Sequence, residues 1–384
     1  MEKNHQKPHA IMIAYPLQGH VIPSVQLAMK LASKGFTITF VNTQSIHHQI
    51  TKSHPNTTTS DAEDIFTEAR KSGLDIRYNV VSDGFPLGFD RSLNHDQFLE
   101  GVLHVMSAHI DELVANTIKT NPPPTCLIAD TFFVWSSMIS NKYNLVNVSF
   151  WTEPALVFTL YYHLDLLRSN GHFASIDNRD DVIDYIPGVR AVEPKDLMSY
   201  LQASDISTVV HRIIFKAFED VKKADFIICN TVQELEHETI SALNKKQPTY
   251  AIGPIFRTGF TKSVVATSLW SESDCTQWLD TKRNGSVLYI SFGSYAHASK
   301  NDIAEIAHGL LLSGKQINRD EVVEKIHRLI SRKSGDDLRK NIKEVKKKLE
   351  NALSTVGSSE ENFNQFICDV QIKTKKKRAS ANHA

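Results

Sequence analysis

The sequence predicts an α/β protein built on a doubly wound parallel sheet, followed by a second α/β unit that is incomplete. Three observations predict this arrangement. Short apolar runs alternate with helical patterns over residues 10–252, as in the strand–helix–strand units of parallel sheets. The same alternation starts again near residue 273. After Phe292 it stops, and the remaining residues show only charged, amphipathic helical patterns.

The first strand–helix–strand unit is the clearest of the series. Residues 10–15 form an apolar run that ends at Pro16, and residues 22–34 carry apolar side chains at helical spacing. Gly35 ends this helix, and the β-branched run at 37–41 is typical of a strand. Five more strands are expected at 76–81, 126–129, 145–150, 226–229 and 249–252. Helices are expected at 98–118, 133–143, 157–168 and 210–222.

The second unit begins like the first but lacks most of its strands. Residues 286–292 are apolar on both faces, as in a central parallel strand, and a helix is expected over 301–312. Only helical patterns follow, at 319–331, 336–353 and 359–370. A complete domain needs about 20–30 residues for each strand–helix unit. We therefore expect a first domain at 1–252, a linker at 253–272, an incomplete second domain with the C-terminal helices at 273–372, and a basic, disordered tail at 373–384.

Composition excludes several classes of function. The 43 basic side chains balance the 43 acidic ones, so we expect neither nucleic acid nor an anionic membrane as a partner. No apolar run reaches the ~18–20 residues of a membrane helix, and the polar N-terminus does not resemble a secretory signal. The expected location is cytoplasmic. The basic run at 373–378 could serve targeting or nucleic-acid binding, but a solvated tail is the favoured interpretation.

The cysteines and the acidic residues predict no metal site. The four cysteines lie far apart in the sequence, at Cys126, Cys229, Cys275 and Cys368, which argues against both a zinc site and a disulfide framework. Two of them, Cys126 and Cys229, lie in apolar runs and are expected to be buried. No acidic pair follows a strand in a position to bind a metal ion.

A histidine and an aspartate follow two of the predicted strands. His20 lies within PLQGHVIP, where the first strand passes into the first helix, at the sheet edge where ligands bind in open α/β folds. It can act as a general base, although on this segment alone a helix-capping or backbone-bonding role is favoured. Asp130 follows the fourth strand and could orient His20 or cap the next helix. Both roles can hold together.

The turn Ser291-Phe292-Gly293-Ser294 is a weaker candidate for a phosphate site. Backbone N–H groups between a strand and a helix can bind phosphate, but many such turns contain glycine and serine. A dinucleotide site requires three glycines after the first strand. Only Gly19 is present there, which argues against a nicotinamide or flavin enzyme.

A set of motifs resembles the plant family of UDP-dependent glycosyltransferases, family 1. The motifs follow the family's order over residues 10–314: PLQGHVIP at 16–23, SDGFP at 82–86, Asp130, FWT at 150–152, YIPG at 185–188, IGPI at 252–255, and CTQWLD at 275–280 leading to SVLYISFGS at 286–294. The resemblance implies the GT-B fold, in which two Rossmann-like domains face each other. The first binds a small lipophilic acceptor and the second binds a UDP-sugar, here expected to be UDP-glucose.

The resemblance also implies roles for individual residues. His20 would deprotonate the acceptor hydroxyl or carboxyl, and Asp130 would orient His20. The acceptor oxygen would then displace UDP with inversion, without a metal or another cofactor. Gly293 and Ser294 would lie near the donor phosphates. The acceptor side would be formed by Gly19, Phe132, Phe133, Trp151 and Tyr161.

The chain departs from the family in its second domain. The family's donor-binding segment contains Trp-x-x-Gln and His-Cys-Gly-Trp-Asn-Ser, and neither motif is present. Residues 317–322 and 358–370 nevertheless resemble the family's final helices, which predicts an internal deletion near 314–316, from alternative splicing or a faulty gene model. We expect donor binding to be weak or lost and transferase activity to be small or absent. The alternatives are an acceptor-binding or regulatory variant and a non-functional product.

Overall fold

The computed structural model divides the chain into two compact units. The first comprises Met1–Trp270 and Ala352–Ala384, and the second comprises Ser271–Asn351. Each unit is described by itself below. The described residues are 7–54, 64–174, 181–256, 265, 267–270, 274–283, 287, 289–295, 298–312 and 332–381.

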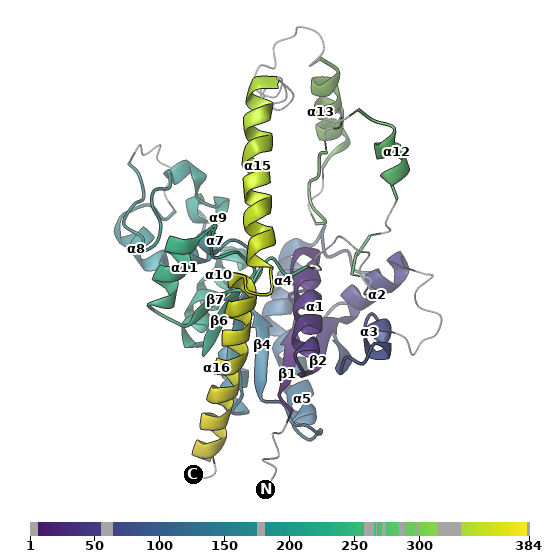
Figure 1. Ribbon diagram of the computed structural model, residues 1–384, viewed down its shortest axis with the longest axis vertical. Helices are drawn as coiled ribbons and strands as arrows, with labels where there is room; N and C mark the ends of the chain where they lie inside the picture. The colour runs from purple at the N-terminus through teal and green to yellow at the C-terminus, as the bar shows by residue number, and fades with distance from the viewer. Residues whose placement is uncertain are drawn as a thin grey trace. The chain divides into compact units, whose positions relative to one another are not determined.

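The first unit is built on a seven-stranded sheet whose strands are all parallel (Figure 1). Its strands are β1 His9–Ile13, β2 Thr37–Thr43, β3 Ile76–Val81, β4 Cys126–Asp130, β5 Val146–Trp151, β6 Phe226–Cys229 and β7 Thr249–Ala251. They lie in the order β3-β2-β1-β4-β5-β6-β7. The predicted doubly wound sheet is confirmed. Its strand order reverses between β1 and β4, the place where such sheets bind ligands.

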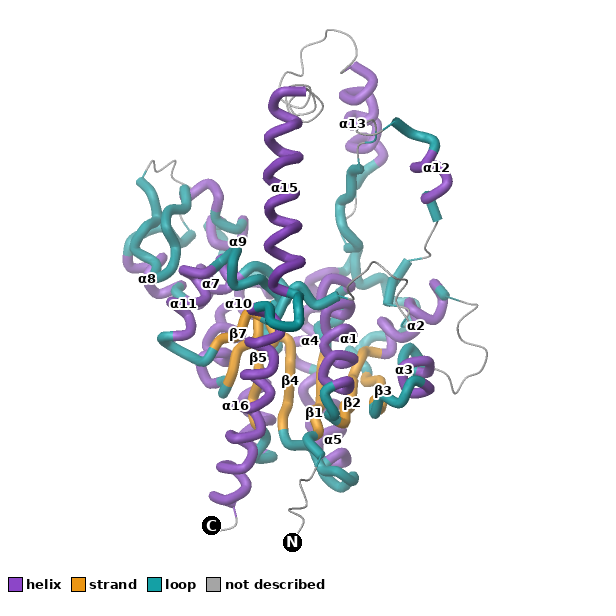
Figure 2. The backbone as a smooth tube through the Cα atoms, in the orientation of Figure 1, coloured by secondary structure: helices purple, strands orange, loops and turns teal. Residues whose placement is uncertain are grey.

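Helices cover both faces of this sheet (Figure 2). Alternate residues of one strand point to opposite faces: Ala10 and Met12 belong to one hydrophobic cluster, and Ile11 and Ile13 belong to another. The helices of the first unit are α1 Gln18–Ser33, α2 Gln44–Ser53, α3 Thr67–Lys71, α4 His95–His104, α5 Met106–Thr117, α6 Ser136–Lys142, α7 Ala155–Tyr162, α8 Leu164–Ser169, α9 Ser199–Gln202, α10 Val209–Asp220, α11 His237–Asn244 and α16 Ser358–Ala381. Helices α1 and α16 pack on the first face, and α4, α5 and α6 pack on the second.

Three predicted helices differ from the observed ones in ways that matter for the site. The pattern at 98–118 forms two helices, α4 and α5, which meet at Val105. The pattern at 157–168 likewise forms α7 and α8, which meet at His163. Helix α1 begins at Gln18, one turn before the predicted start, and contains Pro23. Proline favours the first turn of a helix, so the sequence placed the start too late. The earlier start brings His20 into the first turn.

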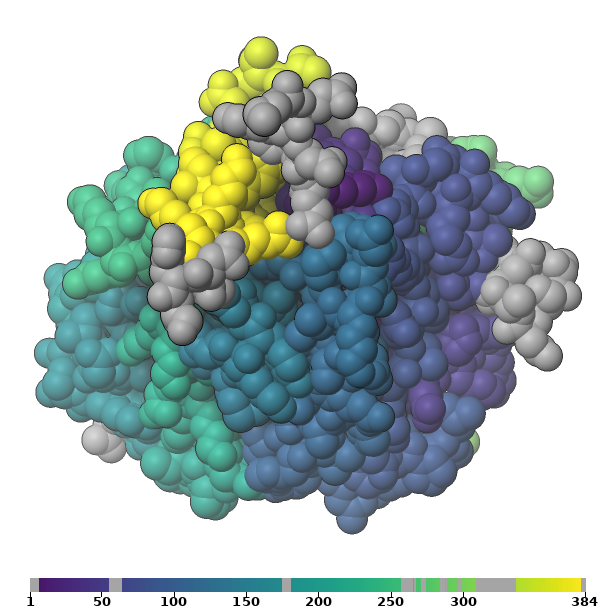
Figure 3. All heavy atoms as spheres, turned by 90° about the horizontal axis from the view of Figure 1, so that it is seen from below, coloured from purple at the N-terminus to yellow at the C-terminus, as the bar shows by residue number. Residues whose placement is uncertain are grey.

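The C-terminal segment does not form the disordered tail that its charge predicts. Helix α16 continues to Ala381 and packs against β5 and β7, with Phe363 and Phe366 buried in the core of the first unit. Lys373 Nζ and Lys377 Nζ pair with the Asp225 carboxylate at 2.9 and 3.0 Å. The prediction failed because a charge count along the chain cannot show an acidic partner 148 or more residues away. Figure 3 shows this helix, in yellow, against the body of the first unit.

The expected linker is also partly fixed on the first unit. Val265 is fully buried, and Leu269 packs against the core. The Leu269 N–H donates to Gln18 Oε1 at 3.2 Å, and its carbonyl accepts from Ser53 Oγ at 2.7 Å. These contacts hold Leu269 against the first residue of α1 and the last residue of α2.

The second unit contains helices α12 Thr276–Asp280, α13 Lys300–Leu312 and α15 Arg332–Ala352. The predicted strand at 286–292 is not formed in its described residues, 287 and 289–292, and Tyr289 is 86% and Phe292 50% exposed. A parallel strand needs neighbours to satisfy its backbone groups, and none is present among the described residues of this unit. The helix predicted at 319–331 lies outside the described residues. Within the described chain, no helix is long and apolar enough to cross a membrane.

Candidate active site

The candidate site lies at the carboxyl ends of three adjacent strands. Strand β1 is followed by the first turn of α1, which carries His20. Asp130 is the last residue of β4, and Thr152 follows the last residue of β5. The three strands are neighbours in the order β1-β4-β5. Because parallel strands end at the same edge of a sheet, residues far apart in the sequence meet here.

His20 and Asp130 form the central contact of this site. His20 Nδ1 lies 2.7 Å from Asp130 Oδ2, and both side chains are largely buried. Burial lowers the pKa of His20, but the charge of Asp130, the hydrogen bond to it and the charge of Glu153 outweigh this effect and raise the pKa. A proton on Nδ1 that is donated to Asp130 leaves Nε2 able to accept a proton. Among the described residues, no hydrogen-bond partner contacts Nε2.

Asp130 also holds the chain that leaves β4. Its Oδ1 accepts from the Phe132 backbone N–H at 3.0 Å, and its carbonyl accepts from the Phe133 N–H at 3.1 Å. Both predicted roles therefore occur together, although α6 itself begins later, at Ser136. The carboxylate is fixed by the turn, and its second oxygen is directed to the imidazole.

Thr152 and Glu153 also lie in the site, although the sequence patterns did not single them out. Thr152 Oγ1 lies 3.1 Å from His20 Nδ1, so it is a second neighbour of the nitrogen that contacts Asp130. Glu153 is partly buried, and its pKa is raised by burial and by Asp130, while His20 opposes the rise. A signal was available, because both residues directly follow β5, the strand beside β4. The predicted strand end at residue 150 left them unconsidered.

Aromatic rings surround the imidazole. The Tyr15 ring centroid lies 5.5 Å from that of His20, and the Phe132 centroid lies 5.8 Å from it. Phe132 also contacts Trp151, at 5.3 Å between centroids. Tyr15 was not predicted. Its position just after β1 was the available signal.

The other expected acceptor residues are placed differently. Phe133 and Trp151 are almost completely buried, and Trp151 Nε1 donates to the Pro154 carbonyl at 2.9 Å. Tyr161 is also buried, with its ring 5.2 Å from that of Phe218. These three rings support the site from the core. Gly19 is exposed beside His20, and a Cβ added there would meet no atom within 4 Å.

The expected donor residues lie in the second unit. Gly293 has a φ of +83°, and its N–H donates to Ser291 Oγ at 3.3 Å. Ser294 is partly buried in the same turn. Helix α13 begins only at Lys300, where Ser299 and Asp302 cap it reciprocally. The turn is therefore separate from the helix N-terminus that was expected to help bind phosphate.

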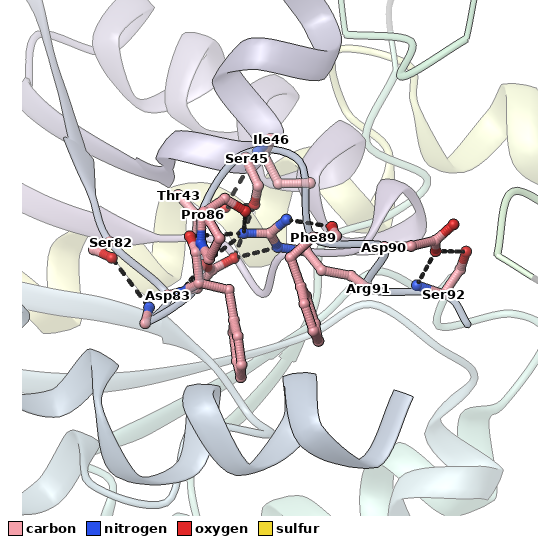
Figure 4. A network of polar contacts seen from close by, with 12 residues as sticks. Thr43, Ser45, Ile46, Ser82, Asp83, Pro86, Phe89, Asp90, Arg91 and Ser92 are labelled. Carbon is pink, nitrogen blue, oxygen red and sulfur yellow. Dashed lines mark hydrogen bonds and ion pairs between the residues drawn. The ribbon is translucent and has the colours of Figure 1, made fainter. Parts of the chain in front are cut away.

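A buried ion pair fixes the loop that follows β3 (Figure 4). Arg91 Nε and Nη2 donate to the two oxygens of Asp83 at 2.6 and 2.8 Å, and Ser45 Oγ donates to Asp83 Oδ2 at 2.9 Å. Burial raises the pKa of Asp83, but Arg91 and Ser45 lower it further, below its usual value. The fixed loop carries Phe85 and Phe89, whose rings stack with 4.3 Å between centroids. Phe89 packs on the cluster that contains Tyr15.

The polar groups of this arrangement suit proton transfer better than metal binding. A carboxylate, an imidazole and an aromatic lining can take a proton from a bound hydroxyl group. The described residues contain no group of three metal-ligating side chains. Cys126 and Cys229 are buried as expected, and burial raises the pKa of both thiols.

The chain is similar to named plant proteins over most of its length. It is 51% identical to UDP-glycosyltransferase 86A1 of Arabidopsis thaliana over 483 residues, which cover 98% of this chain and 97% of the relative. The chain belongs to the family of plant UDP-glycosyltransferases. UDP-glycosyltransferase 86A2 of the same plant is 62% identical over 310 residues, 80% of this chain and 63% of that relative. (R)-Mandelonitrile β-glucosyltransferase of Prunus dulcis is 31% identical over 81% of this chain and 66% of its own length.

Solved structures agree with this family in fold. The UDP-glycosyltransferase is similar to a Phytolacca americana enzyme complexed with UDP-2-fluoro-glucose and pterostilbene, with a TM-score of 0.71, 18% identity and coverage of 94% and 99% of the two chains. A protein from O. sativa in complex with UDP gives a TM-score of 0.73 at 16% identity, with 94% and 100% covered. The expected GT-B fold is confirmed by these matches. No family model matches the chain.

The alignment with the first relative also bears on the internal deletion. It extends over 483 residues, whereas this glycosyltransferase has 384. About a hundred positions of the relative therefore have no counterpart here. Because the match covers 97% of the relative, the unmatched positions lie inside the alignment and not beyond its ends. The second and third relatives are matched over less than two thirds of their own lengths.

Proposed function

We propose that the first unit binds a small lipophilic hydroxyl compound beside His20, and that the chain has little or no transferase activity. The contact between His20 Nδ1 and Asp130 Oδ2 at 2.7 Å is the observation that carries the first part. It fixes the tautomer that leaves Nε2 basic. The partly exposed Phe132 ring and the stacked Phe85 and Phe89 rings supply apolar surface near the same sheet edge.

The reaction to which such a site belongs is an inverting transfer. Nε2 of His20 takes the proton of the acceptor hydroxyl, and the acceptor oxygen forms a bond to the anomeric carbon of a UDP-sugar. The bond from that carbon to the diphosphate oxygen breaks, and UDP leaves with its negative charge. Asp130 stabilises the imidazolium during this step. The glucosyltransferase name of the Prunus dulcis relative supports UDP-glucose as the donor. A cytoplasmic location and a place in plant secondary metabolism are part of the same proposal.

The second part of the proposal rests on the donor side. A leaving diphosphate needs preorganised hydrogen-bond donors to stabilise its charge. Gly293 and Ser294 lie in a turn that no helix follows directly. Residues 289–292, which precede this turn, form no strand. Together with the internal gap against the Arabidopsis relative, this supports a chain that retains the acceptor side and lacks most donor contacts. An acceptor-binding or regulatory role is then the second candidate function.

Calorimetric titration tests both parts. The purified 384-residue chain is titrated with UDP and UDP-glucose, and separately with pterostilbene, the ligand of the Phytolacca americana structure. We expect no saturable micromolar binding of either nucleotide and measurable binding of pterostilbene. The His20→Leu variant should weaken pterostilbene binding several-fold, and the exposed His237→Leu should not.

Either of two results would contradict this proposal. Saturable binding of UDP-glucose, together with a transfer rate near that of the Arabidopsis relative, would show that the remaining second unit builds a donor site. Binding of pterostilbene that is unaffected by His20→Leu would place the acceptor elsewhere.

A further inference from the structure

Thr152 contacts His20 from a short turn between β5 and α7. Its Oγ1 lies 3.1 Å from His20 Nδ1, and among the described residues no other hydrogen-bond partner contacts this hydroxyl. The turn consists of residues 152–154, because β5 ends at Trp151 and α7 begins at Ala155. The position of the Thr152 hydroxyl therefore depends on what fixes the two ends of this turn.

The segment that follows β6 fixes both ends of the turn. At the first end, the Asn230 N–H donates to the Trp151 carbonyl at 2.8 Å. At the second end, the Glu236 carboxylate accepts from the Ala155 and Leu156 N–H groups at 2.9 and 2.8 Å. These two N–H groups belong to the first turn of α7, where no helical carbonyl can accept from them. The residue before α7 provides no side-chain cap, so Glu236 caps this helix from a distant part of the chain.

Glu236 is itself fixed by its backbone and its side chain. It directly precedes α11, where its carbonyl accepts from the Ile240 N–H at 2.9 Å and its N–H donates to the Val232 carbonyl at 3.3 Å. Its carboxylate also accepts a hydrogen bond from Thr231 Oγ1. A helix N-terminus favours negative charge, and hydrogen bonds to a carboxylate are stronger than those between neutral groups. The Glu236 carboxylate can therefore determine where α7 begins.

The Thr152 hydroxyl influences which nitrogen of His20 holds the proton. The Asp130 carboxylate can only accept hydrogen bonds, so its 2.7 Å contact favours a proton on Nδ1. Thr152 Oγ1 can accept a share of the same proton, which stabilises this tautomer further. If the turn moved, this second contact would be lost and the tautomer with its proton on Nε2 would gain population. In that tautomer Nε2 cannot take a proton from a bound hydroxyl group.

We propose that Glu236 is a positioning residue for the candidate site. By holding the start of α7, it keeps Thr152 against Nδ1 of His20 and so keeps Nε2 free to take a proton. The inference rests on the proposed role of His20 and extends it to a residue that acts only through the turn at 152–154. Because its effect on His20 passes through Thr152, the two residues should not act independently.

NMR of the imidazole nitrogens tests this coupling. Long-range proton–nitrogen spectra of the 384-residue chain, recorded above the pKa of His20, measure the ratio of the Nδ1–H to the Nε2–H tautomer. We expect Nδ1–H to dominate, and Glu236→Ala to lower the ratio at least about threefold, as loss of one hydrogen bond would. Thr152→Val should lower it similarly, and adding Glu236→Ala to Thr152→Val should have no further effect. Glu238→Ala, the same change at an exposed glutamate that pairs with Arg190, should leave the ratio unchanged.

The outcomes separate this inference from the proposed function. An unchanged ratio in Glu236→Ala, or a fall that is equally large in the Thr152→Val background, overturns the role of Glu236 and leaves acceptor binding intact. Absence of pterostilbene binding overturns the proposed function, whereas the tautomer ratio still decides the role of Glu236. If circular dichroism shows that Glu236→Ala fails to fold, Glu236→Gln replaces it. This variant keeps one accepting oxygen, so we expect a smaller fall, which Thr152→Val should likewise abolish.

Discussion

The Nδ1 atom of His20 lies 2.7 Å from Oδ2 of Asp130, although 110 residues separate the two in the sequence. The contact exists because β1 and β4 are neighbours in the sheet and end at the same edge. His20, in the helix turn after β1, and Asp130, the last residue of β4, are thereby held on either side of the point where the strand order reverses. A histidine in this position has one nitrogen bound to a carboxylate and the other available to a ligand.

Replacing Asp130 by asparagine should lower the pKa of His20. The carboxylate is the main group that raises this pKa, and burial opposes it. In Asp130→Asn the effect of burial remains, so we expect the pKa to fall below the usual histidine value of about 6.5. An NMR titration of the imidazole protons measures the change. An unchanged pKa would show that Asp130 does not carry a charge next to His20.

The same contact predicts a pH dependence of stability. The pKa of His20 is raised in the folded protein, so the folded state binds this proton more tightly than the unfolded state. This contribution to the folded state's stability is fully present below the pKa of His20 in the unfolded chain, about 6.5. It is lost as the pH rises through the raised, folded value. The difference in unfolding free energy between the original chain and Asp130→Asn should therefore be larger at low pH than at high pH. Urea unfolding at several pH values measures it.

Restoring the missing segment should restore transfer. The stretch of the Arabidopsis relative that has no counterpart here is inserted directly after residue 314, where the sequence predicts the deletion. We expect the extended chain to bind UDP-glucose and to glycosylate a phenol at a rate that mass spectrometry of the product can follow. His20→Ala in the extended chain should lower the rate by about 10²–10⁴-fold, the usual contribution of a general base. Activity that survives this change would rule out His20 as the base.

Removing Arg91 should strongly destabilise the first unit. Asp83 is 2% and Arg91 9% exposed, so Arg91→Met leaves a buried carboxylate without its charged partner, with the hydrogen bond from Ser45 remaining. Loss of one member of a buried pair costs about 3–5 kcal/mol. We expect a decrease of this size in the free energy of unfolding by urea, and the double variant Asp83→Leu/Arg91→Met should recover much of it. As a surface control, Arg190→Met disrupts the exposed pair with Glu238 and should cost less than about 1 kcal/mol.

The C-terminal lysines should contribute unequally to stability. Lys377 Nζ donates to the Leu145 carbonyl at 2.6 Å and pairs with Asp225, whereas Lys375 is exposed two residues earlier on the same helix. Lys377→Ala should reduce the free energy of unfolding by about 1–2 kcal/mol, and Lys375→Ala by much less. Equal effects would mean that these contacts with Leu145 and Asp225 do not hold α16 in place.

Local sequence patterns were sufficient for most of the first unit. The apolar run at 226–229 forms a strand with the predicted bounds, because a buried parallel strand must be apolar on both faces. The partly exposed edge strand at 76–81 also has its predicted bounds. His20 and Asp130 could be selected for a related reason. Residues that directly follow such strands lie at one edge of the sheet, so the strand prediction also located the candidate site. The family motifs then suggested what these residues do.

The features that failed depend on partners distant in the sequence. Residues 286–292 have the composition of a central strand, but a strand forms only when neighbours pair with its backbone. The basic run in α16 appears unpaired along the chain, yet Asp225 lies beside it in space. Thr152 and Glu153 were missed because only the order of β4 and β5 in the sheet brings them to His20. The sequence by itself determined which segments could form strands and helices, and which residue could act as a base. The tertiary structure decided which of them found a partner, since pairing and electrostatic energies depend on distance in space.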